Sequence, residues 1–402
     1  MHKIESKQAG VGVVLAIIGL DASGIGLTLP ILPRLLSEVA HTTELGWRYG
    51  AFLSLYALMQ FLFSPVLGMW SDKIGRRPVL LGSLAGATID YLFMALAPSL
   101  SLLFVGRAIS GLTGASQAVA SAYIADVTSE TQRARRFGQL SAFQGLGFIA
   151  GPLVGGMLGN VWLRGPFVAA AVLNGITFLV TLLLLREPPR HHHVEEQEAS
   201  LNPIKPFRWA LSIPTLLPLL LIYMVFTLIG QVGGTIWVIY RADQFAWTPF
   251  WIGISIACFG LGHAVAQAFI AGPAAERFGE RFTLLLGVFS DAAASVALGF
   301  ATRGWMAFAV MPLFCLGGVG FPALQSLLTR QADAQNQGRL QGVLASLLSL
   351  SSIVGPLAIS AIYFASRNRF PGLVWVAAAT MYLIVLPSLI NLSAKSRAVT
   401  AQ

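Results

Sequence analysis

The chain has 402 residues, of which 55% are hydrophobic and only 11% are charged. A soluble domain carries about 25% charged residues, so this composition excludes a soluble protein and indicates a chain that uses lipid as its solvent. The formal net charge is +9, but in a membrane the position of each charge matters more than the sum. Both cysteines, Cys258 and Cys315, stand inside apolar runs, which is typical of small buried residues rather than of a disulfide or a metal site.

Twelve apolar stretches are long enough to cross a hydrocarbon core of about 30 Å. Backbone polar groups in lipid must be satisfied within the segment, so we predict an all-α integral membrane protein with twelve transmembrane helices. The first stretch is too long for a signal-peptide core and is expected to be an uncleaved span. The predicted spans are 11–34, 46–70, 78–97, 101–125, 137–160, 165–185, 214–240, 249–271, 282–301, 304–327, 340–364 and 372–393.

Lysine and arginine are distributed unevenly over the loops between these spans. If both termini lie on one side of the membrane, 18 of the 26 Lys and Arg residues lie on that side as well. The positive-inside rule then predicts that both termini lie in the cytoplasm. The longest polar segment, residues 186–213, is predicted to be a cytoplasmic linker. Its adjacent histidines, His191–His193, are interpreted as part of a solvated loop, because three neighbours cannot form a good tetrahedral site.

The two halves of the chain repeat at a constant offset of 204 residues. At this offset Gly68, Gly75 and Arg77 correspond to glycine, glycine and arginine in the second half. Gly151 and Pro152 correspond to a second Gly-Pro pair at 355–356. Parallel repeats of six spans imply two bundles, residues 1–185 and 214–402, with a site between them that opens alternately to either side.

Ionisable residues at membrane depth are few: Asp21 in the first span, Asp90 in the third, His263 in the eighth and Asp291 in the ninth. Arg107 and Asp126 are placed at the two ends of the fourth span. A charged Asp at the bilayer centre costs about 2.5–3.5 kcal/mol, so each should face the bundle interior or a watery cavity. The alternative is that these side chains form interhelical hydrogen bonds with a structural role alone. For His263 this alternative and a functional role are equally well supported by the sequence. A buried carboxyl group that holds either a proton or a cation supplies the simplest chemistry for antiport.

The loop after the second span carries the charged motif "GMWSDKIGRR", residues 68–77. Gly68 is expected to allow tight helix packing, and Asp72 to lie near the N-terminus of the next helix, where the helix dipole favours an anion. Pairing of the arginines with carboxylates and helix C-termini would latch a cytoplasmic gate. For Lys73 and Arg77 an orienting role alone is the alternative. The gating set is Gly68, Asp72, Lys73, Gly75, Arg76, Arg77, Arg107 and Asp126.

The second copy of this loop and the fifth span show how far the repeat extends. The second loop keeps Glu276 and Arg277 but has Ala275 before the acid, which predicts a weaker latch. The fifth span contains "GLGFIAGPLVGG", residues 145–156, where glycines recur every four residues and a proline permits a bend. We expect close helix packing there and a seal against leak. The residues of this second motif are Gly147, Gly151, Pro152, Gly155 and Gly156.

These motifs resemble the major facilitator superfamily, in its loop signature and in its antiporter signature of the fifth span. A closer resemblance, over nearly the whole chain, is to the tetracycline/proton antiporters of Gram-negative bacteria, of the class A and B type. It is carried by segments such as "LDASGIGLTLPILP", "GRRPVLLGSLAGATIDY", "ATRGWMAF" and "SSIVGPL". The resemblance weakens around residues 113–123 and at "GQVGGTIWVIY", residues 230–240, where "GG" replaces a proline and small residues.

The resemblance implies the major facilitator fold and an exchange of a proton for a monocationic chelate of tetracycline with a divalent metal such as Mg²⁺. It implies that Asp90 contacts the substrate, that Asp21 serves substrate and coupling, and that Asp291 and His263 lie on the proton path. Gln60 and Gln231 are expected either to contact the substrate or to join helices. No permanently bound cofactor or metal, no nucleic acid and no obligate protein partner is expected, so a monomer in lipid suffices.

Other functions fit less well. A nutrient importer is disfavoured by the glycine pattern of the fifth span and by the lack of a dense polar sugar-binding set. A membrane sensor or scaffold needs no intramembrane aspartates, and an intramembrane enzyme needs a nucleophile–base pair or a metal set that the sequence does not contain. A phosphate-binding Gly-x-x-x-x-Gly-Lys-[Ser/Thr] motif is also missing. Export of another amphipathic or cationic drug stays open, because the seventh span differs.

Overall fold

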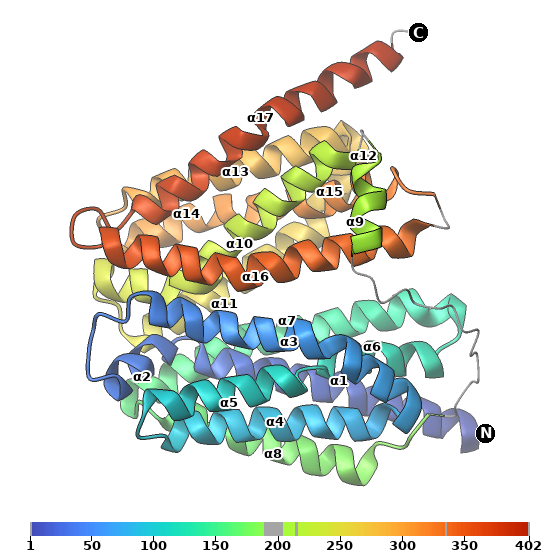
Figure 1. Ribbon diagram of the computed structural model, residues 1–402, viewed down its shortest axis with the longest axis vertical. Coiled ribbons are helices and arrows are strands. Elements are labelled where there is room, and N and C mark those ends of the chain that lie inside the picture. The colour runs from blue at the N-terminus through green and yellow to red at the C-terminus, as the bar shows by residue number, and fades with distance from the viewer. Residues whose placement is uncertain (1, 189–203, 214–215, 334–335, 401–402) are drawn as a thin grey trace. The chain divides into compact units, whose positions relative to one another are not determined.

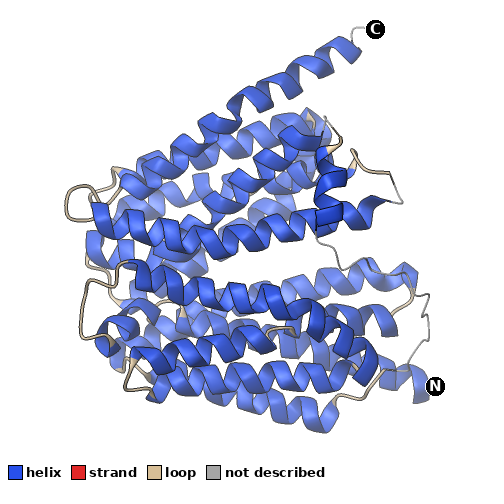
Figure 2. Cartoon of the chain, in the orientation of Figure 1, coloured by secondary structure: helices blue, strands red, loops and turns tan. Residues whose placement is uncertain are grey.

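The computed structural model describes residues 2–188, 204–213, 216–333 and 336–400. His191–His193 and most of the expected linker therefore lie outside the described residues. Within the described ranges the chain is helical almost throughout and contains no strand (Figure 2). The predicted all-α membrane fold is confirmed.

Eight helices lie within the described residues 2–188 (Figure 1). They are α1 (His2–Thr28), α2 (Leu32–Val39), α3 (Trp47–Ile74), α4 (Arg76–Leu96), α5 (Leu100–Thr113), α6 (Ser116–Val127), α7 (Glu130–Val161) and α8 (Gly165–Leu184). The first span was expected to reach residue 34, but α1 ends at Thr28. The reason is local, since Pro30 and Pro33 lack the backbone N–H that an uninterrupted helix needs.

The second part adds α9 (Ile204–Leu211), α10 (Leu216–Phe245), α11 (Pro249–Ala266), the π-helical turn η1 (Gln267–Ala271), α12 (Gly272–Phe278), α13 (Glu280–Gly299), α14 (Gly304–Gly317), α15 (Gly320–Thr329), α16 (Gln337–Ser366) and α17 (Leu373–Thr400). Ten helices within the described residues are long and apolar enough to cross a membrane. The fourth predicted span consists of two helices, α5 and α6, and the twelfth contributes the shorter apolar helix Leu373–Pro387.

The chain divides into two compact units. The first comprises Met1–Val194 with Ala246–Gly260, and the second comprises Glu195–Phe245 with Leu261–Gln402. The boundary thus falls inside α11, whose first residues group with the first unit. In the first unit, aliphatic side chains of α1, α4 and α6 form a buried core around Val14, Ile18, Leu80, Leu84 and Ile124.

Helix packing within each unit follows the sequence repeat. In the first unit α1 packs along α7, α4 along α8, and α4 against α5. In the second unit the equivalent pairs are α10 with α16, α13 with α17, and α13 with α14. The two bundles are therefore built on one internal plan, as the constant offset predicts.

Candidate functional site

The most deeply buried carboxylate of the first unit is Asp90 on α4. Its side chain is 1% exposed and lies 3.4 Å from the guanidinium of Arg107 on α5. Arg107 also stacks over the ring of Phe52, at 4.7 Å from the centroid, and faces the ring of Tyr56 at 5.6 Å. Arg107 was expected at the end of its span, but it lies two turns inside α5 and belongs to the intramembrane set. Its charge offsets the cost of burying Asp90.

The second carboxylate of this unit, Asp21, lies near the middle of the apolar segment Gly10–Thr28 of α1. It interacts with the Ser116 hydroxyl, which belongs to the first residue of α6. Tyr56 and Tyr91 lie close enough to both Asp21 and Asp90 to interact with each carboxylate. The first unit thus gathers two acids, one arginine and two tyrosines in its interior.

A discontinuity in the fourth span lies beside this cluster. The helix unwinds at Gly114, with φ −71° and ψ 76°, and at Ala115, with φ −126° and ψ 5°. Side chains satisfy the backbone groups set free there, since Gln60 donates to the Gly114 carbonyl at 3.0 Å and Ala115 donates to the Ser83 hydroxyl at 3.3 Å. Non-helical backbone at membrane depth survives only where protein or a cavity covers it. Gln60 therefore joins helices in this structure.

In the second unit Asp291 and His263 approach the same short stretch of backbone. Asp291 accepts a hydrogen bond from the Tyr382 hydroxyl at 2.7 Å. A Cβ atom at Gly317 would lie 2.8 Å from that of Asp291, and one at Gly318 would collide with the imidazole of His263. The two adjacent glycines end α14, so the junction between α14 and α15 is what lets both ionisable groups come close.

Gln231 on α10 joins two helices of the second unit. Its amide donates to the Ser352 hydroxyl on α16 at 3.1 Å. Its side chain also covers Gly355, where a Cβ atom would lie 2.8 Å from the Gln231 Cγ. The Gly-Pro pair of the second half is therefore a packing contact with α10, as its counterpart is with α1.

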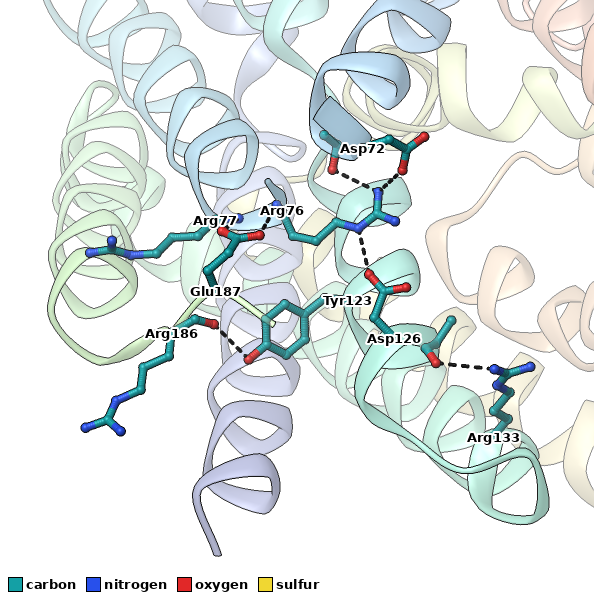
Figure 3. Close-up of polar contacts among 10 residues, drawn as sticks. Asp72, Arg76, Arg77, Tyr123, Asp126, Arg133, Arg186 and Glu187 are labelled. Atoms are coloured by element: carbon teal, nitrogen blue, oxygen red, sulfur yellow. Dashed lines mark hydrogen bonds and ion pairs between the residues drawn. The ribbon is translucent and has the colours of Figure 1, made fainter. Parts of the chain in front are cut away.

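The charged loop motif forms a compact cluster in the first unit (Figure 3). Arg76 pairs with Asp126 on α6 at 2.9 Å and with Asp72 one turn before it. Arg77 donates to the Leu182 carbonyl in the last turn of α8. Both arginines make the contacts expected of them, whereas Lys73 is exposed at the end of α3.

Two expectations about this loop are wrong. Asp72 belongs to the last turn of α3, and the acid at the N-terminus of α4 is instead Glu187, which accepts hydrogen bonds from the backbone N–H groups of Arg76 and Arg77 (Figure 3). Sequence reasoning missed Glu187 because 111 residues separate it from Arg76. Gly68 has no packing role here, since a Cβ atom there would meet nothing within 4 Å. The position in this loop that requires glycine is Gly75. Its φ is 114°, and an added Cβ atom would collide with the Glu187 side chain.

The glycines of α7 form a flat face against α1. A Cβ atom at Gly151 would lie 2.6 Å from the Ser23 carbonyl oxygen, and Cβ atoms at Gly147 and Gly155 would collide with carbonyl oxygens of α1. The ring of Pro152 lies against Gly26. Gly156 faces another element, the start of α11, where a Cβ would lie 2.5 Å from the Pro249 carbonyl oxygen. The predicted close packing is confirmed.

The second copy of the loop has no ion pair at the two positions that the sequence singled out, which agrees with the weaker latch expected of them, but it has one at another position. Glu276 and Arg277 are exposed on α12, and neither forms an ion pair within the described part of the chain. Arg277 lies instead over the ring of Phe278, at 5.5 Å. The acid that is paired in this half is Glu280, the first residue of α13. Applying the repeat offset to Arg76 would have found it.

Comparisons with known proteins agree with this architecture. The family model of the Major Facilitator Superfamily matches residues 12–238 and 219–400. The "Tetracycline resistance protein, class C" of Escherichia coli is 50% identical over 94% of this chain and 95% of that protein. The class G protein of Vibrio anguillarum is 48% identical over 94% of this chain and 96% of that protein. The crystal structure of the nucleoside transporter NupG shares the fold, with a TM-score of 0.77, 13% identity, and coverage of 95% of this chain and 98% of that one.

The match to the family model spans both halves, and the class C and G relatives match almost from end to end. These findings make the protein a multipass membrane transporter rather than an enzyme. The chain therefore belongs to the Major Facilitator Superfamily, and within it to the family of the tetracycline resistance proteins.

Proposed function

We propose that this protein is a proton-coupled antiporter that exports tetracycline from the cytoplasm by alternating access and thereby confers resistance to it. The observation that carries the proposal is the 50% identity to the class C tetracycline resistance protein over 94% of the chain. Exchange for protons follows from the acids in the interior of both units. The drug is exported as a monocationic chelate with a divalent metal ion, so the metal arrives with the substrate and no cofactor stays bound.

The first unit supplies the groups that meet the cationic substrate. Asp90 lies 3.4 Å from Arg107, so a metal–drug cation that binds Asp90 must compete with that guanidinium. Asp21 has a weaker partner, the Ser116 hydroxyl. We assign Asp90 to substrate binding and Asp21 to both substrate binding and coupling, because only a carboxylate without a fixed counter-charge exchanges freely between a proton and a cation.

The second unit supplies the proton path. Asp291 hydrogen-bonds Tyr382, and together with His263 it borders the glycines that end α14. A carboxyl group and an imidazole that approach consecutive residues of one helix junction supply the two proton-exchanging groups that we assign to this path. Gln60 and Gln231 support the sites by holding helices together, through their bonds to Gly114 and Ser352.

We place the protein in the bacterial inner membrane with both termini in the cytoplasm, following the excess of Lys and Arg on that side. Within the expected linker, residues 186–213, Arg186 and Glu187 are bonded to the first bundle, so the two halves are connected by the part of this segment that follows Glu187. The loop cluster around Arg76 is the cytoplasmic latch, and the glycine face of α7 is the seal. A single chain in lipid carries all these elements, so a monomer suffices.

A different drug of the same chemical class is the second candidate. A Cβ atom at Gly230, Gly233 or Gly234 on α10 would meet no atom within 4 Å, so this glycine face is not a packing contact within the described residues. The face lies within residues 230–240, where the resemblance to the tetracycline/proton antiporters weakens. An amphipathic cation other than tetracycline could be accommodated by such a face.

The test uses everted membrane vesicles that contain the protein and are energised to an acidic lumen. Tetracycline is added with Mg²⁺, and drug uptake and lumenal pH are recorded together. Uptake coupled to proton efflux is expected, and removal of Mg²⁺ with a chelator should stop both. Vesicles with Asp291→Asn serve as the control.

Each departure from that result has a defined meaning. Uptake without proton efflux would refute antiport, and uptake that continues in chelator would refute the metal complex. Proton efflux that responds to other cationic drugs but not to tetracycline would refute the substrate and favour the second candidate, with α10 as the element to mutate.

A further inference from the structure

The two charged loops share one backbone conformation. Gly75 precedes α4 with φ 114° and ψ 161°, and Gly279 precedes α13 with φ 84° and ψ 156°. These glycines stand 204 residues apart, which is the repeat offset. The residue that follows each glycine therefore occupies an equivalent place, at the first position of a helix. That residue is Arg76 in the first unit and Glu280 in the second.

Both of these residues form an ion pair with a residue at the end of a helix that follows in the chain. Arg76 pairs with Asp126 at the end of α6, at 2.9 Å. Glu280 pairs with Arg330 at the end of α15, at 2.8 Å. Asp126 and Arg330 also stand 204 residues apart. The pair is thus repeated with its polarity reversed, because both partners change sign together.

Helix dipoles distinguish the two pairs. The N-terminus of a helix favours negative charge and its C-terminus favours positive charge. In the second unit Glu280 is the first residue of α13 and Arg330 is the C-cap of α15, so both charges suit their helix ends. In the first unit Arg76 stands at an N-terminus and Asp126 near a C-terminus, so both oppose theirs. The carboxylate of Glu187 supplies the anion that the start of α4 otherwise lacks.

The surroundings of Glu280 point the same way. Its side chain is 15% exposed and also accepts a hydrogen bond from the Ser326 hydroxyl on α15. Two bonds from one helix therefore hold the start of α13. Arg76 instead divides its bonds among Ser71, Asp72 and Asp126 on two helices.

We propose that Glu280 and Arg330 are a positioning pair that clamps α13 to α15 and stays closed throughout the transport cycle, in contrast to the Arg76–Asp126 pair, which opens. This proposal rests on the proposed function as an alternating-access transporter. It reverses the expectation of a weaker latch in the second half, because the charges there are placed with both helix dipoles rather than against them.

The test replaces the clamp by a covalent one. In a Cys258→Ser/Cys315→Ser background, Glu280→Cys/Arg330→Cys removes both charges, and a bis-methanethiosulfonate reagent then joins the thiols. Before cross-linking, the maximal rate of tetracycline uptake should fall about threefold with KM unchanged. After cross-linking, the rate should return to that of the background. The single variant Glu276→Gln, an acid of the same loop at the repeat position of Asp72, should have no effect.

Cross-linking that abolishes transport would overturn the proposal, since the pair would then have to open. The proposal would also be overturned if the Glu280→Cys/Arg330→Cys variant, before cross-linking, transported at the rate of the Cys258→Ser/Cys315→Ser background. The ion pair would then have no positioning role. A raised KM with an unchanged maximal rate would assign the residues to drug binding instead.

A second measurement needs no drug and separates this proposal from the proposed function. Amide hydrogen exchange is followed in purified protein at the start of α13 and the end of α15. Exchange should be slowest in the wild type, intermediate in the polarity-swapped Glu280→Arg/Arg330→Glu variant and fastest in Glu280→Gln. Equal rates in all three would refute the clamp. If the wild-type protein transports no tetracycline, the proposed function fails and this order of rates alone decides on the pair.

Discussion

Gly151→Ala is expected to separate the two helices that pack most closely in the first unit. The added Cβ atom would lie 2.6 Å from the Ser23 carbonyl oxygen, and 2.8 Å and 3.0 Å from the Cα and carbonyl carbon of Gly26. Ordinary contacts of such an atom begin at 3.4 Å. All three neighbours belong to the backbone of α1, so no side chain can rotate away. The helices must move apart by somewhat less than 1 Å.

The magnitude follows from two opposing terms. Overpacking of a close interface costs about 1–3 kcal/mol, and the rigid neighbours at Gly151 place this substitution at the upper end. Alanine in place of glycine inside a helix gains about 0.5–1 kcal/mol. The net loss should therefore be about 2–2.5 kcal/mol. With an unfolding entropy of about 2.1 cal/mol/K per residue over 402 residues, this loss corresponds to a fall of roughly 2–3 °C in Tm.

The assay is the loss of monodisperse protein after heating in detergent, followed by size-exclusion chromatography. Gly145→Ala on the same helix is the matched control, because a Cβ atom there meets nothing within 4 Å. This control should be neutral or slightly stabilising, since only the helix term applies. Equal heat stability of the two variants would show that α1 and α7 do not pack as described.

Three further predictions concern the charged groups. Asp21→Asn, Asp90→Asn and Asp291→Asn should each abolish proton-coupled uptake in everted vesicles while the amount of protein in the membrane stays normal, and wild-type uptake by any one would remove that acid from the mechanism. Arg107→Gln should destabilise the protein by about 3–5 kcal/mol because it leaves a buried carboxylate without its counter-charge; adding Asp90→Asn should restore heat stability but not transport, and a double variant no more stable than the single one would contradict the pairing. Glu187→Gln should cost about 1 kcal/mol at most and leave KM for tetracycline unchanged, so a raised KM would assign Glu187 to the substrate site.

The sequence was sufficient for the parts of the fold that depend on periodic or repeated patterns. Apolar length located the spans to within a few residues, and glycine spacing predicted close helix packing at Gly151, although not that α1 is the partner. Both signals are local or follow a constant offset, so no knowledge of tertiary contacts is needed. The first span was overextended because apolar length ignored the prolines at its end.

Pairings between distant segments could not be predicted in the same way. Asp90 with Arg107, Asp291 with Tyr382, and Glu187 with the start of α4 each join helices whose relative rotation decides which side chains meet. Apolar length, from which the spans were located, carries no information on this rotation. The wrong prediction for Asp72 has a similar cause. The motif shows that an acid is present, but it does not show at which helix end that acid lies.

The carboxylate of Glu187 also bears on how the chain can be divided or extended. This residue follows α8 and is bonded to the start of α4, while the Arg186 carbonyl accepts a hydrogen bond from the Tyr123 hydroxyl at 3.1 Å. Residues 186 and 187 therefore belong structurally to the first bundle and are not part of a free linker. If the transporter is split into two separately expressed halves, or if a fluorescent protein is inserted between them, the break or insertion should lie after Pro188. A junction drawn at the last apolar residue of α8 would detach the cap and leave the gate loop without its anchor.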